Sequence, residues 1–387
     1  MKPSLIVLTT LALAGATALA QEGVTDKEVV LGVVVPMSGP AALTGIGAEL
    51  GHRIAAAEVN AAGGINGRKV RIAVEDDGYV PSRAYQGLVK LNDGGVLGIV
   101  GTSGAASLAA MLPVLEEKRI PTIVNTSVSK AAVEPVRPHI FMIGASYQDL
   151  FFAEVKYIRE HDKPSGPYAL IRQDDDYGAL VEDGFKRAVN DFKLPSVEVI
   201  RFKRGQKEFA AEILKLRSEK IGAIAIGGVI AEIPAVLKEL AKLKMNIPVA
   251  TPHTGNIAMA SKLSAPYGMS YYAADYVATL QSDGAKNFRA LANKYLSEDE
   301  RSNMNRFSIT AYLGTKVMIK AAEECGKDVN RACVVGKIKA MRSFDTNGLT
   351  KPLDFSKPNN TAATAVQVVR VDPVKGTITD VTGFVDY

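Results

Sequence analysis

The sequence predicts an α/β protein of two doubly wound lobes, each with a parallel sheet covered by helices. Short β-branched apolar runs alternate with longer segments of helical period, which is the pattern of consecutive βαβ units. This alternation runs through the first third of the chain and restarts near Tyr168. The length of 387 residues also suits two domains of about 100–200 residues each. No internal repeat or low-complexity segment interrupts the pattern.

The first half of the pattern holds four strand-like runs and three helix-like segments. The expected strands are Val29–Pro36, Val70–Glu75, Leu97–Gly101 and Thr122–Asn125, and the expected helices are Thr44–Ala61, Ser82–Asn92 and Ala106–Lys118. Helices between successive strands are the connections that parallel sheets require. This half therefore predicts one complete lobe.

The second half repeats the arrangement. The expected strands are Tyr168–Arg172, Ser196–Arg201, Ala223–Gly227 and Ile247–Thr251, and the expected helices are Gly178–Phe192, Lys207–Glu219 and Ile230–Leu243. After this lobe, residues 286–342 have mostly helical period and residues 366–384 alternate like strands.

The N-terminus has the three parts of an export signal. Lys2 supplies the positive start, Leu5 to Ala14 the apolar run, and Ala18 to Ala20 the small-residue cleavage site. A retained membrane anchor is the weaker alternative, because a bilayer span needs about 20 apolar residues. We expect cleavage after Ala20 and a freely diffusing protein in the periplasm.

The charges are nearly balanced. The net charge is +5 for the whole chain and +4 without Lys2, the one charged residue of the first 20. This balance favours no nucleic-acid partner. The two cysteines, Cys325 and Cys333, are expected to form a disulfide in an oxidising compartment rather than a metal site, since no histidine lies near them in sequence.

Enzymatic motifs fail their own structural requirements. Gly45, Gly47 and Gly51 nearly form a dinucleotide fingerprint, but the last spacing is one residue too long. Residues 101–105 nearly form a nucleophile elbow, but the final glycine is missing and no partner histidine is identifiable. The four histidines are scattered without metal-ligand spacing. We expect no enzyme, no metal and no cofactor.

Three expected strands end in small polar residues, at 37–40, 101–105 and 125–127. Ligands of open parallel sheets bind outside the carboxyl ends of the strands, where backbone N–H groups point outward. Helix caps and tight turns use the same residue types, so each loop alone has an ordinary structural explanation. Three such loops at successive strand ends favour a site for an anion or an amide.

An ordered set of short motifs carries a resemblance to a known family. The set is Ser38-Gly39-Pro40, Asn60 with Gly63-Gly64-Ile65-Asn66-Gly67-Arg68, Asp76-Asp77, the loop at Gly101, and Asp176-Tyr177-Gly178. In this order, behind an export signal, it resembles the periplasmic leucine/isoleucine/valine-binding proteins of ABC importers. The resemblance covers almost the whole mature chain.

The resemblance implies a type I periplasmic binding fold, in which three crossover strands form a hinge between two Rossmann-like lobes and ligand binds in the cleft. Lobe one would comprise residues 21–145 and 276–350, and lobe two residues 146–275 and 351–387. The chain would cross near Gly144, near Tyr271–Tyr276 and near Pro352. Closure on the ligand would be a hinge motion that the membrane permease recognises.

The resemblance also implies ligand-binding residues. Hydroxyls and backbone N–H groups of two lobe-one loops would hold a carboxylate, and a lobe-two tyrosine would pack on the ligand. The residues that match these roles are Ser103, Gly104, Ala105, Ala106, Thr126, Ser127 and Tyr177. The register of the first loop is ambiguous by a residue or two, and Tyr177 has the alternative of a core tyrosine.

Three further positions depart from the family. His253 stands where a glutamate would neutralise an amino-acid ammonium, Val229 replaces a second tyrosine, and Thr44 replaces an aromatic residue. A buried, unpaired ammonium costs several kcal/mol. Glu232 and Asp175 are possible substitutes, although both are simply interpreted as residues at helix starts.

We therefore predict an extracytoplasmic solute-binding protein for a small carboxylate-bearing solute, such as an aromatic, keto or other organic acid. Its expected partners are this solute and the permease and ATPase subunits of an ABC importer at the inner membrane, and it is expected to act as a monomer. Two alternatives stay open: a binding protein for branched-chain or other amino acids, and a ligand sensor or chemoreceptor accessory. His253 is either a donor to the ligand or an ordinary polar turn residue.

Overall fold

The computed structural model describes residues 22–126 and 129–386. The expected leader and its cleavage site, and Ser127, lie outside the described residues. Within the described residues, no helix combines the length and the apolar character that crossing a bilayer requires.

The first lobe has a five-stranded parallel sheet in the order β2-β1-β3-β4-β5. Its strands are β1 (Glu28–Val35), β2 (Lys69–Asp76), β3 (Gly98–Gly101), β4 (Thr122–Val124) and β5 (Ile140–Met142), and the helices between them are α2 (Ala42–Ala61), α3 (Pro81–Asp93) and α4 (Ala105–Glu117). The inner strands β1 and β3 are almost wholly apolar and buried because helices cover both faces of the sheet, whereas the edge strand β2 carries several charged residues.

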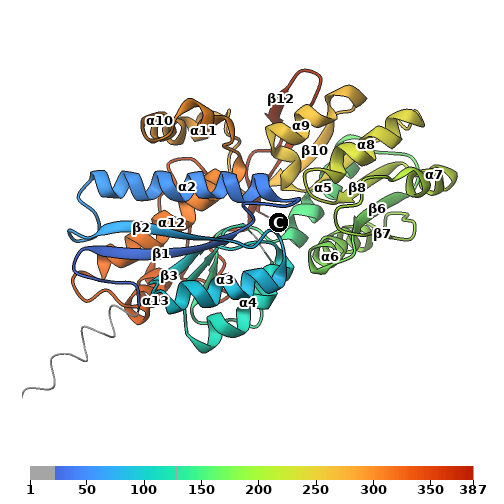
Figure 1. Cartoon of the computed structure of the whole chain (residues 1–387). Coiled ribbons are helices and arrows are strands. Elements are labelled where there is room, and N and C mark those ends of the chain that lie inside the picture. The colour runs from blue at the N-terminus through green and yellow to red at the C-terminus, as the bar shows by residue number, and fades with distance from the viewer. Residues whose placement is uncertain (1–21, 127–128, 387) are drawn as a thin grey trace, which may run out of the picture.

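The second lobe repeats this order with β7-β6-β8-β9-β10. Its strands are β6 (Tyr168–Gln173), β7 (Ile200–Phe202), β8 (Ala223–Gly227), β9 (Val249–Thr251) and β10 (Tyr271–Asp275), and its helices are α5 (Tyr147–His161), α6 (Asp176–Asp191), α7 (Ala210–Ser218), α8 (Glu232–Lys242) and α9 (Ala258–Ser264). The two lobes lie side by side in Figure 1, the first at the left and the second at the right. The predicted α/β fold class is confirmed.

After β10 the chain returns to the first lobe, where α12 packs lengthwise on α2 (Figure 1). The returning helices are α10 (Lys286–Tyr295), α11 (Glu298–Ser302), α12 (Arg306–Glu324) and α13 (Arg331–Ala340). Cys325 at the end of α12 and Cys333 in the first turn of α13 form a disulfide.

The last strands extend the sheet of the second lobe. β11 (Ala365–Asp372) pairs antiparallel with β10, and β12 (Thr377–Asp380) and β13 (Val385–Asp386) pair antiparallel with β11. The tail therefore has the strands that its alternating sequence predicts, and the short turn between β11 and β12 makes these two an antiparallel hairpin.

The chain passes between the lobes three times. It leaves lobe one after β5 at Gly144, where the ring of Tyr276 packs so closely that a Cβ would lie 2.1 Å from it. It returns at Tyr276, whose hydroxyl donates to the Asn125 carbonyl at 2.6 Å. The third passage comes later than expected: Asn360 and Ala362 hydrogen-bond the backbone of Met142 in β5. The segment before β11 thus lies along lobe one, and the crossing falls near Ala363 rather than near Pro352.

Candidate functional site

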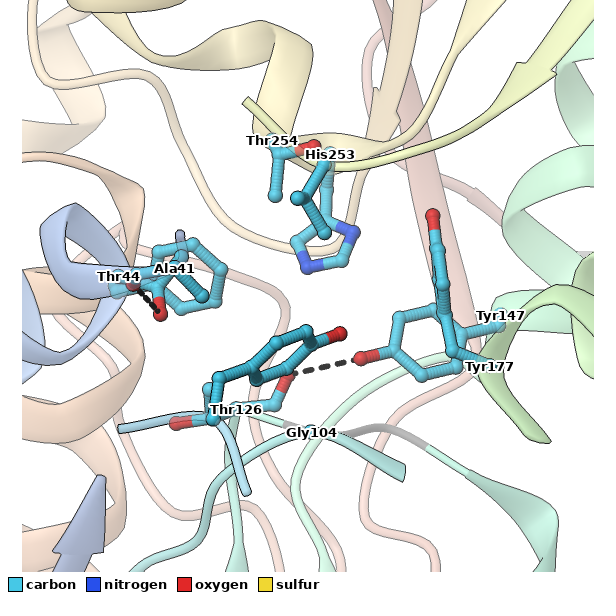
Figure 2. A pocket seen from close by; sticks show the side chains of 11 residues that line it. Ala41, Thr44, Gly104, Thr126, Tyr147, Tyr177, His253 and Thr254 are labelled. Atoms are coloured by element: carbon cyan, nitrogen blue, oxygen red, sulfur yellow. Dashed lines mark hydrogen bonds between the residues drawn. The ribbon is translucent and has the colours of Figure 1, made fainter. Parts of the chain in front are cut away.

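A pocket lies between the two lobes, at the carboxyl ends of both parallel sheets. About 370 Å³ of space not filled by protein atoms lies in and around it, part of which is open to solvent. The lobe-one side chains come from the start of α2, the ends of β2, β3 and β4, and the start of α12; those of lobe two come from the starts of α5 and α6 and the ends of β8 and β9 (Figure 2). The lining residues are Ala41, Thr44, Tyr79, Gly104, Thr126, Tyr147, Tyr177, Val229, His253, Thr254 and Phe307.

The structure brings together most of the residues that the sequence singles out. Thr44, Gly104, Thr126, Tyr177, Val229 and His253 all line this pocket. In the loop after β3, Gly104 lines it, whereas Ser103, Ala105 and Ala106 do not. Gly104 is the N-cap residue of α4.

Five lining residues were not expected from the sequence: Ala41, Tyr79, Tyr147, Thr254 and Phe307. Tyr79 follows Asp76-Asp77 at the end of β2, so the rule that ligands bind at carboxyl ends of strands would have found it. Tyr147 follows Ser146, whose capping box with Asp149 fixes the start of α5. Phe307 comes from a long helical stretch whose sequence carries no signal for a site.

Aromatic rings form much of the wall. The rings of Tyr147 and Tyr177 meet edge to face with centroids 4.9 Å apart, and His253 lies 5.5 Å from Tyr147 and 5.4 Å from Phe307. The Tyr177 hydroxyl donates to the Gly228 carbonyl, which fixes this ring within lobe two. The Tyr147 hydroxyl reaches the Thr126 carbonyl of lobe one at 3.4 Å (Figure 2). Such walls suit a flat or apolar ligand body.

His253 is the first residue of a short 3-10 helix after β9 and is 3 % exposed. Burial, with a contribution from the nearby Arg306 guanidinium, holds the pKa of His253 well below its usual value. The imidazole is therefore neutral at physiological pH. Its Nδ1 has no hydrogen-bond partner among the described residues, and the ring reaches into the pocket in Figure 2. It offers a hydrogen bond but no charge.

Two helix N-termini of lobe one meet the pocket. Gly104 precedes α4 and Ala41 precedes α2, and neither helix start has a side-chain cap. Uncapped N–H groups and the positive end of the helix dipole favour an anion. Beside Gly104, the Ser103 hydroxyl is buried with no hydrogen-bond partner among the described residues, and the same holds for the Thr254 hydroxyl, which lies on the lobe-two wall beside His253. The lobe-one side of the pocket, at the starts of α2 and α4, is therefore electrostatically suited to a carboxylate.

Among the described residues, no acidic side chain lines the pocket. The two carboxylates considered as substitutes for the missing glutamate are occupied elsewhere. Glu232 accepts hydrogen bonds from the N–H groups of Val229 and Gly205 at 3.1 and 3.2 Å. Asp175 accepts from the Gly178 N–H and from Arg204. Neither is free to neutralise a ligand ammonium.

A buried ion pair supports the site from behind. Arg306, at the start of α12, donates Nε to Oδ2 of Asp275 at 2.8 Å and Nη2 to Oδ1 at 2.7 Å. Both side chains are at most 1 % exposed. Asp275 ends β10, so the pair joins the second lobe to the helix that carries Phe307. The described residues contain no group of three or more His, Cys, Asp or Glu side chains placed to hold a metal ion.

The fold and the cleft define a two-lobed binding protein. The sequence of residues 28–377 matches the family model described as periplasmic binding protein, which covers most of the chain. The chain belongs to the periplasmic binding protein family, and the expected kinship with the leucine/isoleucine/valine-binding proteins is confirmed.

Two curated relatives are Leu/Ile/Val-binding proteins. The one from Rhizobium johnstonii is 23 % identical over 347 residues, which cover 88 % of this chain and 91 % of the relative. The one from Escherichia coli is 28 % identical over 232 residues, which cover 59 % of this chain and 62 % of the relative.

Solved structures share the fold. A fatty acid ABC transporter substrate-binding protein from Thermomonospora curvata has a TM-score of 0.85 at 20 % identity, with 94 % of each chain covered. A solute-binding protein of an ABC transporter from R. palustris, in complex with benzoate, has a TM-score of 0.80 at 16 % identity, with 92 % of this chain and 96 % of that chain covered. At these identities the similarity establishes the fold alone.

Proposed function

We propose that this chain is the extracytoplasmic binding component of an ABC importer and that it takes up a small carboxylate-bearing solute without an ammonium group. Aromatic, keto and other organic acids form this class. The observation that carries the proposal is the chemistry of the cleft: uncapped helix N-termini on the lobe-one side, aromatic rings along the walls, and no carboxylate among the described lining residues.

The absence of a lining carboxylate argues against a free amino acid. An α-amino acid carries an ammonium, and burying it without an opposite charge costs several kcal/mol. His253, in the position that the family fills with glutamate, is held neutral by burial. Glu232 and Asp175 already accept hydrogen bonds from protein donors. A keto or carbonyl oxygen would instead find a donor in the neutral imidazole or in Thr254.

The rest of the proposal concerns transport. The proposed partners are the permease and ATPase subunits at the inner membrane, which would recognise the closed form of a monomer in the periplasm. Relatives named Leu/Ile/Val-binding proteins support this general role. A benzoate complex in a protein of the same fold supports a carboxylate that lacks an amino group. Ligand capture needs no covalent chemistry, so we propose no enzymatic activity.

The rival candidate is a branched-chain amino acid, which the names of the relatives favour. A thermal-shift screen separates the two. A ligand at about a hundred times its dissociation constant adds about 2.7 kcal/mol to the folded state. We expect organic acids to raise the melting temperature and the free amino acids to leave it unchanged. Stabilisation by leucine, isoleucine or valine alone would contradict the proposed ligand class.

The role of His253 can be tested with the acid that the screen identifies. His253→Ala removes a hydrogen bond and part of an aromatic wall, and we expect at least tenfold weaker binding by calorimetry. His161→Ala is the matched control, because His161 is exposed on α5, where it contacts the carbonyl and the ring of Tyr157 and does not line the pocket. Unchanged affinity in His253→Ala would exclude a ligand role for this histidine.

A further inference from the structure

Tyr79 occupies an unusual position at the end of β2. Its backbone is left-handed, with φ of 65°, which a bulky residue adopts only when its surroundings hold it there. Asp77 provides this support: its Oδ1 accepts the Tyr79 N–H at 3.0 Å, while its Oδ2 accepts the hydroxyl of Ser107 in α4 at 2.8 Å. The side chain of Tyr79 is thereby directed into the pocket.

The ring of Tyr79 lies against the N-terminus of α4. A Cβ on Gly104 would stand 2.5 Å from a ring carbon of Tyr79, so only glycine allows this approach. From the other side, Tyr79 packs with Ala41 and with Val229 of lobe two in one small buried apolar cluster. Position 229 is where the family resemblance places a tyrosine. In this chain an aromatic ring from the opposite lobe covers that position.

Arg204 holds Tyr79 from across the cleft. It lies just after β7 in lobe two, and its Nη1 donates to the Tyr79 carbonyl at 2.8 Å. Its guanidinium stands 4.3 Å from the centroid of the Tyr79 ring, within the range of a cation–π interaction. Its Nη2 donates to Asp175 at 2.6 Å, and Asp175 caps α6, the helix that carries Tyr177. One side chain thus connects the walls of both lobes.

We propose that Tyr79 is a specificity-determining residue of the cleft and that Arg204 is its positioning residue, which couples closure of the lobes to the placement of the Tyr79 ring. The ring narrows the cleft beside Val229 and selects flat or slender solutes. The part that concerns solutes rests on the proposed function, whereas the part that concerns closure does not.

Closure can be measured without any ligand. Spin labels at Gln86→Cys on α3 and Arg217→Cys on α7, both exposed positions in different lobes, report the interlobe distance by double electron–electron resonance. We expect Arg204→Ala to lower the ratio of closed to open molecules at least tenfold, because a charge-assisted hydrogen bond and a cation–π contact are lost together. Arg204→Lys keeps the positive charge but loses the planar guanidinium. Its ratio of closed to open molecules should therefore lie between those of the wild type and Arg204→Ala.

The matched control is Arg201→Ala. Arg201 lies on β7 in the same lobe, is 55 % exposed in its side chain and pairs with Glu182 within lobe two. It should leave the distance distribution unchanged. Wild-type distributions in Arg204→Ala would overturn the proposed role of Arg204, as would an equal shift in Arg201→Ala. Melting curves of all variants establish that each is folded.

Specificity is tested with Tyr79→Leu, which keeps apolar volume but removes the ring. With phenylpyruvate as the probe, we expect at least tenfold weaker binding by calorimetry, and a smaller loss for Tyr79→Phe. Wild-type affinity in Tyr79→Leu would overturn the proposed role of Tyr79. If wild-type protein binds amino acids and no organic acid, the proposed ligand class fails, while the distance measurements still decide the role of Arg204.

Discussion

The buried pair of Asp275 and Arg306 allows a quantitative prediction for Asp275→Asn. The substitution keeps the shape of the side chain but leaves the guanidinium buried without an opposite charge. Asp275 also accepts hydrogen bonds from the Tyr276 N–H at 2.8 Å and from Asn256 at 3.1 Å, so its charge is fully engaged at the point where β10 leaves lobe two. Removing the charge of one partner of such a buried pair typically lowers the free energy of unfolding by about 3–5 kcal/mol.

The expected loss of unfolding free energy corresponds to a decrease in melting temperature. Unfolding entropy of about 2.1 cal/mol/K per residue gives about 0.8 kcal/mol/K for the 367 residues that follow the expected leader. A loss of 3–5 kcal/mol then lowers the midpoint by about 4–6 °C for two-state unfolding. Circular dichroism on heating, with urea unfolding at 25 °C for the free energy, measures both quantities.

A surface pair provides the control. Arg71 and Glu28 pair at 3.3 Å with side chains 53 % and 38 % exposed, and Arg71→Gln should change the unfolding free energy by less than about 1 kcal/mol. A loss below about 1 kcal/mol in Asp275→Asn would refute the reasoning, because the buried guanidinium would then not depend on this carboxylate.

Three further predictions follow from buried or constrained groups. Burial lowers the pKa of His52 from 6.5 to about 3, so the unfolded chain binds a proton that the folded chain does not, and stability falls as pH decreases from 6.5 toward 3. In His52→Gln, urea unfolding between pH 6 and 4 should show a slope smaller by up to about 1.4 kcal/mol per pH unit; an unchanged slope would contradict this. The double variant Cys325→Ser/Cys333→Ser removes the disulfide and should lower the free energy of unfolding, measured with urea, by about 2 kcal/mol. An unfolding midpoint equal to that of the wild type would mean that the disulfide does not stabilise the fold. Gly104→Ala should displace the Tyr79 ring and weaken solute binding at least tenfold by calorimetry, and wild-type affinity would contradict the close approach.

The sequence predicts most of the fold because local patterns determine it. The alternation of β-branched runs and helical segments places the first four strands of each lobe within a few residues of their observed bounds, whereas β5, β10 and α5 were not expected from it. The third passage between the lobes was misplaced for a physical reason. Residues 353–362 have no periodicity, and their position beside β5 depends on backbone bonds to Met142 that no local pattern encodes.

Site residues that follow strands could be predicted from the sequence. Site residues that tertiary packing brings to the pocket could not. Gly104, Thr126 and His253 follow strands, and the rule for parallel sheets finds such residues. Phe307 comes from a helix distant in sequence, which Arg306 and Asp275 anchor against the hinge. The contact of Arg204 with Tyr79 spans 125 residues, and in sequence Arg204 belongs to a short basic run whose ordinary interpretation is solvated surface.

The central claim, that the cleft accepts a carboxylate but provides no partner for an ammonium, is tested most directly with matched solutes. Phenylpyruvate and phenylalanine share a carbon skeleton, as do 4-methyl-2-oxopentanoate and leucine. In each pair the keto acid has a carbonyl oxygen at the carbon where the amino acid carries its ammonium group. Calorimetry on the chain from Gln21 onward should show each keto acid binding at least about a hundredfold tighter than its amino acid, which corresponds to about 2.7 kcal/mol. Equal or tighter binding of leucine or phenylalanine would contradict the claim.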